Sequence, residues 1–356
     1  MPSSSSVEKR LTAISEEILL RMNKALTQSF RGPLCEDLRD HVSDLCDTTF
    51  PIRGALVYAG YRLAGGRCQE IMEIATATEL AKIATVVIDD IVDQADVREG
   101  RTAHEAFGLG PSILLGEILK ARASRLFADC VASTPAFANR FVAHRRFELT
   151  YEKVCLGQLL DLRLETASTC SESQYLSMVR LATAGFLEGS VDVGSLLAGA
   201  PSAITRPLRR YAVSIGTALQ IIDDVHDLST EHATGKTFAL DLKRRKKRLP
   251  LIHLLRSCTR SERASIIRIL RKSQINDRDV RRILKLMEIR GSLSYALRRA
   301  RQYYQAAAVE IYRITSNEDR SMLEAILNIV KNGNLDVRLP AVPKAIQNRS
   351  ARSRNS

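Results

Sequence analysis

Apolar residues recur at steps of three and four positions along most of the 356-residue chain, the spacing that puts them on one face of a helix. No stretch of useful length alternates apolar and polar residues as a half-buried strand does. Polar stretches at 94–111 and 230–248 indicate loops. The pattern predicts helices over 7–45, with a break at Gly32-Pro33, and over 53–64, 68–93, 111–130, 136–165, 172–198, 205–229, 249–258, 260–273, 276–289, 291–313 and 317–332.

The two ends of the chain differ from its middle. Residues 1–6 are Met-Pro followed by four serines, and residues 336–356 are basic, contain proline and hold few apolar residues. These features predict a disordered leader and a disordered basic tail. No linker or fixed-period repeat interrupts residues 7–335, so we expect one all-helical domain there.

Composition narrows the class of protein. Hydrophobic residues make up 45% and charged residues 26%, the balance of a globular protein with a sizeable core. Seven scattered cysteines without a CxxC pair indicate reduced thiols in a cytoplasmic protein, and no apolar run is long enough to span a bilayer. The net charge of +13 suits nucleic acid, an anionic membrane surface or phosphorylated small molecules, without choosing among them.

Two acidic motifs of the same form carry the candidate chemistry. They are Asp89-Asp90-Ile91-Val92-Asp93 and Asp223-Asp224-Val225-His226-Asp227. Because residues four apart share a helix face, the first and last carboxylates of each motif point the same way. Charges beside buried apolar stripes need partners, and carboxylate ligands favour a hard cation such as Mg²⁺ that also bridges substrate phosphates. One such cluster would be a solvated helix end, but two copies predict a metal–diphosphate site between two helices.

Further motifs lie between and after the two acidic motifs. They are Arg98-Glu99-Gly100-Arg101 after the first motif, Gly157-Gln158-Leu159-Leu160-Asp161, Gln220 before the second motif, Gly235-Lys236 after it, Asp241-Leu242, and Lys246 with Leu249-Pro250. The ordered set resembles the trans-isoprenyl diphosphate synthases over roughly residues 50–255. Each motif alone is weak, but the set in this order is specific.

This resemblance implies an all-α isoprenoid synthase fold with helices around a central cavity, usually as a homodimer. Mg²⁺, three ions per active site, would bind the diphosphate of an allylic prenyl substrate between the two acidic motifs. The carbon–oxygen bond would then ionise, and in chain-elongating members isopentenyl diphosphate attacks the cation. The apolar cavity below the first motif would hold the growing tail.

The resemblance also assigns residues by position. The metal ligands would be Asp89, Asp93 and Asp223, supported by Asp90, Asp224 and Asp227. Arg98, Lys236 and Lys246 would face diphosphate groups, and Gln158, Asp161 and Gln220 would line the cavity. Each has a simpler alternative, since Arg98 could be a loop charge and Gln158 a surface amide.

Several positions depart from the family pattern. The usual G-K-R-x-R-P segment is Thr49-Phe50-Pro51-Ile52-Arg53-Gly54 here, which keeps only Arg53. The second Arg of R-R-G is Glu99, and the K-T pair of a later helix is Ala182-Thr183. A carboxylate in place of a phosphate-binding Arg repels the ligand. Lys82 replaces a family His or Gln at the isopentenyl site and restores one cation.

Two enzyme interpretations follow. A divergent chain-elongating prenyltransferase would rebuild its isopentenyl site from Arg53, Lys82 and Arg101. A terpene synthase derived from this family would instead cyclise or quench an ionised C15–C25 substrate without isopentenyl diphosphate. We favour the first slightly. Small residues at Ala84 and Thr85, where bulky aromatics shorten products in the family, suggest a C20 product.

Two other classes of function are weaker interpretations. The basic run 243–248 could bind nucleic acid, but such runs are usually solvated loops, and no recognition motif accompanies this one. A non-catalytic subunit of a partner synthase would not need two complete acidic motifs. We therefore expect a prenyl diphosphate enzyme that does not bind nucleic acid.

Overall fold

The computed structural model describes residues 4–30, 35–47, 50–97, 100–228, 238–314 and 320–334. In these ranges the regular elements are helices, apart from one isolated bridge between Val97 and Arg101. This confirms the predicted all-α class. The helices are α1 (Ser4–Ser29), α2 (Glu36–Asp47), α3 (Ile52–Leu63), α4 (Ile71–Val92), α5 (Ala103–Phe107), α6 (Leu109–Ser133), α7 (Arg140–Thr166), α8 (Glu172–Leu181), α9 (Thr183–Leu197), α10 (Ser202–His226), α11 (Leu240–Lys243), α12 (Leu249–Ser257), α13 (Arg260–Leu270), α14 (Asp277–Ile289), α15 (Ser292–Tyr312) and α16 (Arg320–Asn334).

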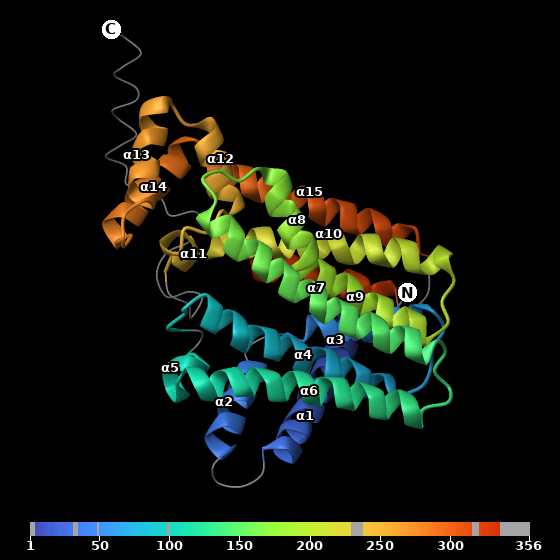
Figure 1. Cartoon of the computed structure of the whole chain (residues 1–356). Helices are drawn as coiled ribbons and strands as arrows, with labels where there is room; N and C mark the ends of the chain where they lie inside the picture. Colours follow the sequence, from blue (N-terminus) through green and yellow to red (C-terminus); the bar gives the residue numbers. More distant parts are fainter. Residues whose placement is uncertain are drawn as a thin grey trace.

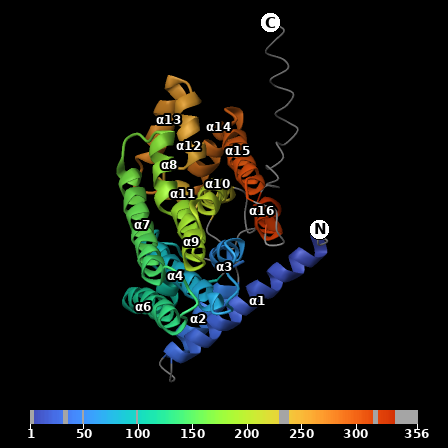
Figure 2. The ribbon, with the colours of Figure 1, turned by 90° about the vertical axis from the view of Figure 1, so that its right-hand side faces the viewer.

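The long helices run side by side in a bundle (Figure 1). Helix α4 packs on α6, α3 packs on α9, and α10 packs on both α9 and α15. Figure 2 shows α1 crossing the bundle beside α3 and α4. Helices α11 to α14 gather at one end of the bundle, beyond the C-terminal end of α10 (Figure 1).

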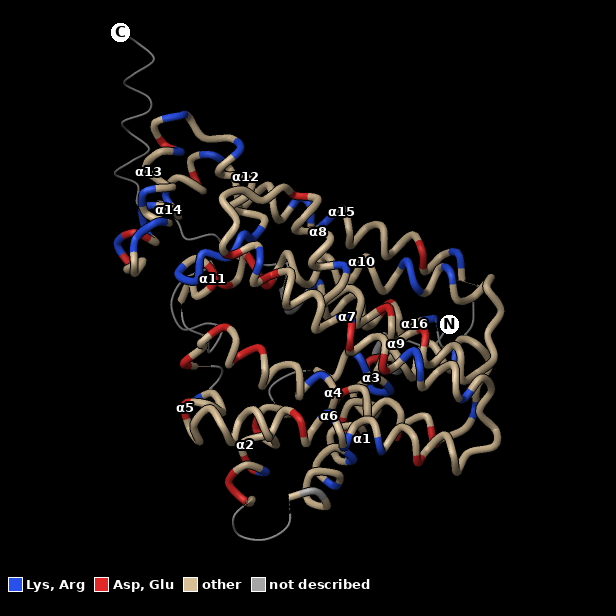
Figure 3. Tube along the Cα trace, in the orientation of Figure 1, with Lys and Arg blue, Asp and Glu red and all other residues tan. Residues whose placement is uncertain are grey.

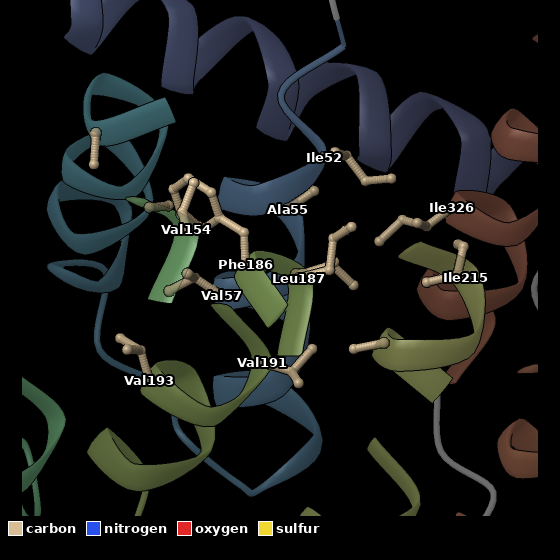
Figure 4. Close-up of a cluster of buried hydrophobic side chains, with 14 of the residues drawn as sticks. Ile52, Ala55, Val57, Val154, Phe186, Leu187, Val191, Val193, Ile215 and Ile326 are labelled. Carbon is tan, nitrogen blue, oxygen red and sulfur yellow. The ribbon is translucent and has the colours of Figure 1, made fainter. Parts of the chain in front are cut away.

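The core has two hydrophobic clusters. The larger joins apolar side chains of α3, α7, α9, α10 and α16, such as Val57, Phe186 and Ile215 (Figure 4). Gly194 lets α3 and α9 come close, because a Cβ on it would lie 2.0 Å from the carbonyl oxygen of Val57. The smaller cluster is built on α11 to α14 and includes Ile266, Ile283 and Met287.

The predicted helix over 172–198 is wrong in one respect, because the chain breaks it into α8 and α9 at Ala182. The cause is a close contact with α7. A Cβ on Gly157 would lie 2.8 Å from the backbone nitrogen of Ala182, so the glycine lets the α7 backbone press against the break. The break turns Thr183 toward α10, where its hydroxyl donates a hydrogen bond to Gln220.

Other boundaries also differ from the prediction. The predicted loops 94–111 and 230–248 contain α5 and α11, and α6 begins at Leu109. Helix α1 begins at Ser4, so part of the predicted leader 1–6 is helical. The break at Gly32-Pro33 and the tail 336–356 lie outside the described residues.

Candidate active site at the ends of α4 and α10

Both acidic motifs lie at helix C-termini. Helix α4 ends at Val92 with Asp93 as its cap, and α10 ends at His226 with Asp227 as its cap. The C-terminus of a helix carries the negative end of the helix dipole, so carboxylates are unfavourable there. Each motif therefore needs nearby cations, supplied by the protein or by a ligand.

The middle carboxylate of each motif points into the protein. Asp90 is 2% exposed and Asp224 is 1% exposed, whereas Asp89 and Asp93 are half-buried and Asp223 is exposed. This division fits the helix period, because neighbouring residues point in different directions. Among the described residues, no three His, Cys, Asp or Glu side chains already converge as a metal cage.

Asp224 is held by three protein groups. The buried Tyr175 hydroxyl on α8 donates a hydrogen bond of 2.5 Å to one carboxylate oxygen. Gln220 donates to the other oxygen at 3.0 Å, and the Arg248 Nε lies 3.5 Å from it. With both oxygens engaged, Asp224 fits a role in positioning better than the direct metal ligation that sequence reasoning also allowed.

Lys246 joins the first motif to the rest of the site. Its Nζ lies 2.6 Å from Asp93 Oδ1 and 2.7 Å from Oδ2, and 3.1 Å from a carboxylate oxygen of Asp161 on α7. It is also 3.9 Å from Asp241 on α11, and it is only 3% exposed. Three neighbouring carboxylates raise the pKa of Lys246 against the effect of burial, so it stays charged.

Arg248 is a site residue that sequence reasoning missed. Its guanidinium forms a bidentate pair with Asp161 at 2.8 and 3.2 Å, and its Nε donates to Asp241 at 2.7 Å. Together with Asp224, it therefore contacts carboxylates from α7, α10 and α11. A continuous series of charged contacts thus runs from Asp93 through Lys246, Asp161 and Arg248 to Asp224.

The prediction that the basic run 243–248 is a solvated loop is wrong. Lys246, Lys247 and Arg248 are buried, at 3%, 7% and 8% exposed. Arg245 donates to the carbonyl oxygens of Leu270, Lys272 and Ser273 at the end of α13. The side chains of this run bind protein groups, and we call residues 243–248 the basic strap.

Buried carboxylates of both motifs hold their protons unusually tightly. Burial, and next the charge of Asp89, raises the pKa of Asp93 to about 6 despite Lys246, which is shared with other carboxylates. Burial raises the pKa of Asp224 to about 7. Burial and then Asp241 raise the pKa of Asp227 well above its ordinary value. These carboxylates are thus costly to ionise in the free protein, first because they are buried and next because other carboxylates lie nearby.

The predicted polar residues Gln158, Thr183 and Gln220 do meet the acidic motifs. Gln158 on α7 donates a hydrogen bond to Asp89. Thr183 and Gln220 lie in series, because Gln220 accepts from Thr183 and donates to Asp224. The first motif is therefore contacted by an amide from α7, and the second by an amide from α10 itself.

Arg53 is the one cation that this chain keeps from the family's G-K-R-x-R-P segment. Its guanidinium carbon lies 4.9 Å from the centre of the Phe186 ring, and in the described part of the chain its buried Nε has no hydrogen-bond partner. Burial lowers the pKa of Arg53, while the charges of Glu79 and Asp223 oppose that effect. Arg53 thus carries its charge near both Glu79 and Asp223 of the second acidic motif.

The remaining described residues of the prediction are Lys82, Ala84 and Thr85 on α4 and Arg101 just before α5. Lys82 is half-buried on α4, and its carbonyl oxygen accepts a hydrogen bond from Thr85. Ala84 is fully buried. Arg101 is exposed and donates to the carbonyl oxygen of Glu105 on α5. The predicted Arg98, Glu99 and Lys236 lie outside the described residues.

None of the described helices combines the length and the apolar character that crossing a bilayer requires.

Comparison with known proteins identifies the family of this chain. Residues 41–287 match the family model described as Polyprenyl synthetase. A geranylgeranyl diphosphate synthase of Mycobacterium tuberculosis is 31% identical over 77% of this chain and 78% of its own. One from Sulfolobus acidocaldarius is 28% identical over 72% of this chain and 78% of its own.

Solved structures agree on the fold. A polyprenyl synthase from Caulobacter crescentus, complexed with calcium and isoprenyl diphosphate, superposes with a TM-score of 0.80 at 24% identity, over 91% of this chain and 97% of its own. A geranylgeranyl pyrophosphate synthase from Corynebacterium glutamicum, complexed with isoprenyl diphosphate and magnesium, gives 0.81 at 21% identity, over 93% and 99%. With two acidic motifs facing one basic strap in this fold, the chain belongs to the polyprenyl synthetase family, the trans-isoprenyl diphosphate synthases, and is by that membership a prenyltransferase.

Proposed function

We propose that this protein is a Mg²⁺-dependent prenyltransferase that ionises an allylic prenyl diphosphate and condenses it with isopentenyl diphosphate to a C20 product. The observation that carries the proposal is the series of charged contacts from Asp93 to Asp224. Through Lys246 and Arg248, it joins the two acidic motifs at one site. The geranylgeranyl diphosphate synthases among the relatives support the product length.

The donor groups fit magnesium. Asp89, Asp93 and Asp223 offer hard carboxylate oxygens, and the exposure of Asp223 leaves it open to a ligand. Burial, and next the charge of Asp89, raises the pKa of Asp93, so a cation bound beside it would favour the ionised carboxylate. When bound, Mg²⁺ would supply Lewis-acid stabilisation of the departing diphosphate.

The chain's own cations have complementary roles. Lys246, now paired with Asp93, lies where it can donate to a diphosphate oxygen as negative charge develops there. Arg248 would keep Asp161 and Asp241 neutralised, so that Lys246 need not serve them alone. Arg53, stacked on Phe186, would bind the diphosphate of isopentenyl diphosphate near the second motif.

The test separates elongation from the second candidate, a terpene synthase. Purified protein is given Mg²⁺ and allylic diphosphates of each length, with and without isopentenyl diphosphate, and the products are identified by mass. Elongation predicts a C20 diphosphate that forms only when isopentenyl diphosphate is present. A hydrocarbon or alcohol that forms without isopentenyl diphosphate would refute elongation. The replacement Ala182, and the loss of the family's Lys and first Arg before Arg53, favour this second candidate.

A second experiment tests the site itself. Changing Asp89→Asn and Asp223→Asn together removes two proposed ligands and should reduce diphosphate release roughly 10²- to 10³-fold, as loss of preorganised charge does in other active sites. Asp96→Asn is the matched control, because Asp96 is an exposed carboxylate just beyond the first motif. Unchanged diphosphate release in the double variant would contradict the proposal, whatever the fate of the carbocation.

We also propose that the enzyme is a homodimer that buries the outer face of α6 and α7. This face exposes large apolar side chains, among them Leu114 at 63%, Phe141 at 88% and Leu159 at 55%. Apolar groups gathered on two neighbouring helices are typical of an interface. Leu114→Glu with Phe141→Glu should give a monomer by light scattering, whereas the control Val309→Glu, on α15, should stay dimeric. A monomeric wild type would contradict the dimer.

A further inference from the structure

The strongest charge imbalance outside the site lies on α13 and α14. Residues 256–290 carry eleven Lys and Arg against four Asp and Glu, a net charge of +7 out of +13 for the chain. Basic residues are concentrated on these two helices, at the end of the bundle near α11 (Figure 3). The catalytic proposal uses none of them.

Helix α14 separates its two faces sharply. Val280, Ile283 and Met287 are fully buried, at three- and four-residue spacing. The opposite face carries four exposed cations at the same spacing, which we call the basic stripe: Arg278, Arg281, Arg282 and Lys285. In the described part of the chain none of the four lies within ion-pair distance of a carboxylate. Ile289, 64% exposed, lies on the same face at the end of the stripe.

The inner face of α14 adjoins the active site. Met287 lines a cavity of about 10 Å³ together with Asp224, Asp227 and Lys246. The basic strap is tied to this unit, because Arg245 caps α13 and Lys243 pairs with Asp277 at 2.9 Å. The stripe lies on the opposite face of α14 from Met287, so a surface that docked on it would be separated from this cavity by the width of one helix, about 10 Å.

We propose that the basic stripe of α14 docks the enzyme on an anionic lipid bilayer. Clusters of four or more Lys and Arg on an amphipathic helix bind anionic lipid headgroups, and an exposed aliphatic residue among them can enter the interface. Resting on the proposed function, docking here would bring the site close to the phase in which a long prenyl tail dissolves. The stripe has no aromatic side chain for stacking on bases, which disfavours nucleic acid.

The test is co-sedimentation of the full chain with vesicles of phosphatidylcholine, with or without phosphatidylglycerol. The wild type should bind only the anionic vesicles and should release them at roughly 0.5 M NaCl, where charges are screened. Neutralising the stripe with R278Q, R281Q, R282Q and K285Q should weaken binding about tenfold or more. The matched control, K9Q, K24Q, R298Q and R301Q, removes the same charge from exposed sites on α1 and α15 and should bind as the wild type does.

Equal losses in the two quadruple variants would overturn the proposal, because net charge and not the stripe would then explain binding. Absence of binding by the wild type would also overturn it. Stripe-dependent binding to duplex DNA without binding to vesicles would assign the surface to nucleic acid instead. None of these outcomes depends on whether isopentenyl diphosphate is a substrate, so the assay stands apart from the catalytic proposal.

Discussion

Replacing Asp93 by Asn should stabilise the metal-free protein at neutral pH, although it removes a contact with Lys246. Burial, and next the charge of Asp89, raises the pKa of Asp93 from 3.8 to about 6. Each pKa unit corresponds to about 1.4 kcal/mol, so ionised Asp93 should lower the free energy of unfolding by about 3 kcal/mol. Lys246 keeps Asp161 and Asp241 as partners, and the new amide oxygen can still accept its hydrogen bond.

The pH dependence fixes the sign of this effect. Because the pKa of Asp93 is higher in the folded state, the folded protein binds more protons than the unfolded chain between about pH 4 and 6. The favourable contribution is complete below the unfolded pKa and is lost as the pH rises through the folded pKa. The wild type and Asp93→Asn should therefore be equally stable near pH 4 and differ most above pH 7.

The assay is urea unfolding of both proteins at several pH values, with chelator and then with Mg²⁺ and pyrophosphate. Ligands that bind only the folded state should raise the stability of the wild type more than that of Asp93→Asn, because the variant has lost a metal ligand. Asp96→Asn should show neither effect, since Asp96 is exposed. If Asp93→Asn is less stable than the wild type at pH 7.5 without metal, the charge argument is wrong.

Three other substitutions test separate parts of the site. Arg53→Gln should raise the KM for isopentenyl diphosphate about tenfold or more through loss of a charge-assisted contact, with the KM for the allylic substrate unchanged; equal effects on both would argue against the assigned role. Tyr175→Phe removes a buried donor to Asp224 and should cost about 1–3 kcal/mol in urea unfolding; a neutral result would mean that water replaces the hydroxyl. Ala84→Phe should shorten the product or exclude the longer substrate, as seen by mass analysis, and an unchanged product would refute the C20 argument.

Local sequence patterns predicted most helices, and they placed both acidic motifs at helix ends. The apolar spacing before Asp89 and Asp223 continues to the helix ends, so periodicity alone places the carboxylates on α4 and α10. Gln158 and Lys246, which the resemblance assigned to the site, both contact the first motif. Such features depend on residues close in sequence or on motifs in a fixed order.

The features that were missed depend on contacts between distant segments. The break at Ala182 has Gly157 of α7 beside it, a contact that the sequence of residues 172–198 alone does not show. The burial of the basic strap requires Asp161, which lies 87 positions from Arg248. A run of cations looks solvated until the carboxylates that neutralise it are known, so charge patterning alone gave the wrong environment.

The charges gathered here explain why metal and substrate should bind together. Among the described residues, the carboxylates at the site, from Asp89 to Asp241, outnumber Lys246, Arg248 and Arg53, whereas the predicted cations Arg98 and Lys236 lie outside the described residues. A diphosphate is itself an anion, so it would add repulsion to a site already short of positive charge. Bound divalent cations would supply further positive charge, and Lys246, now paired with Asp93, would then be available to the diphosphate. The buried acidic motifs are costly in the free protein, and the basic strap offsets part of that cost; the same carboxylates would suit the metal–diphosphate complex that we propose.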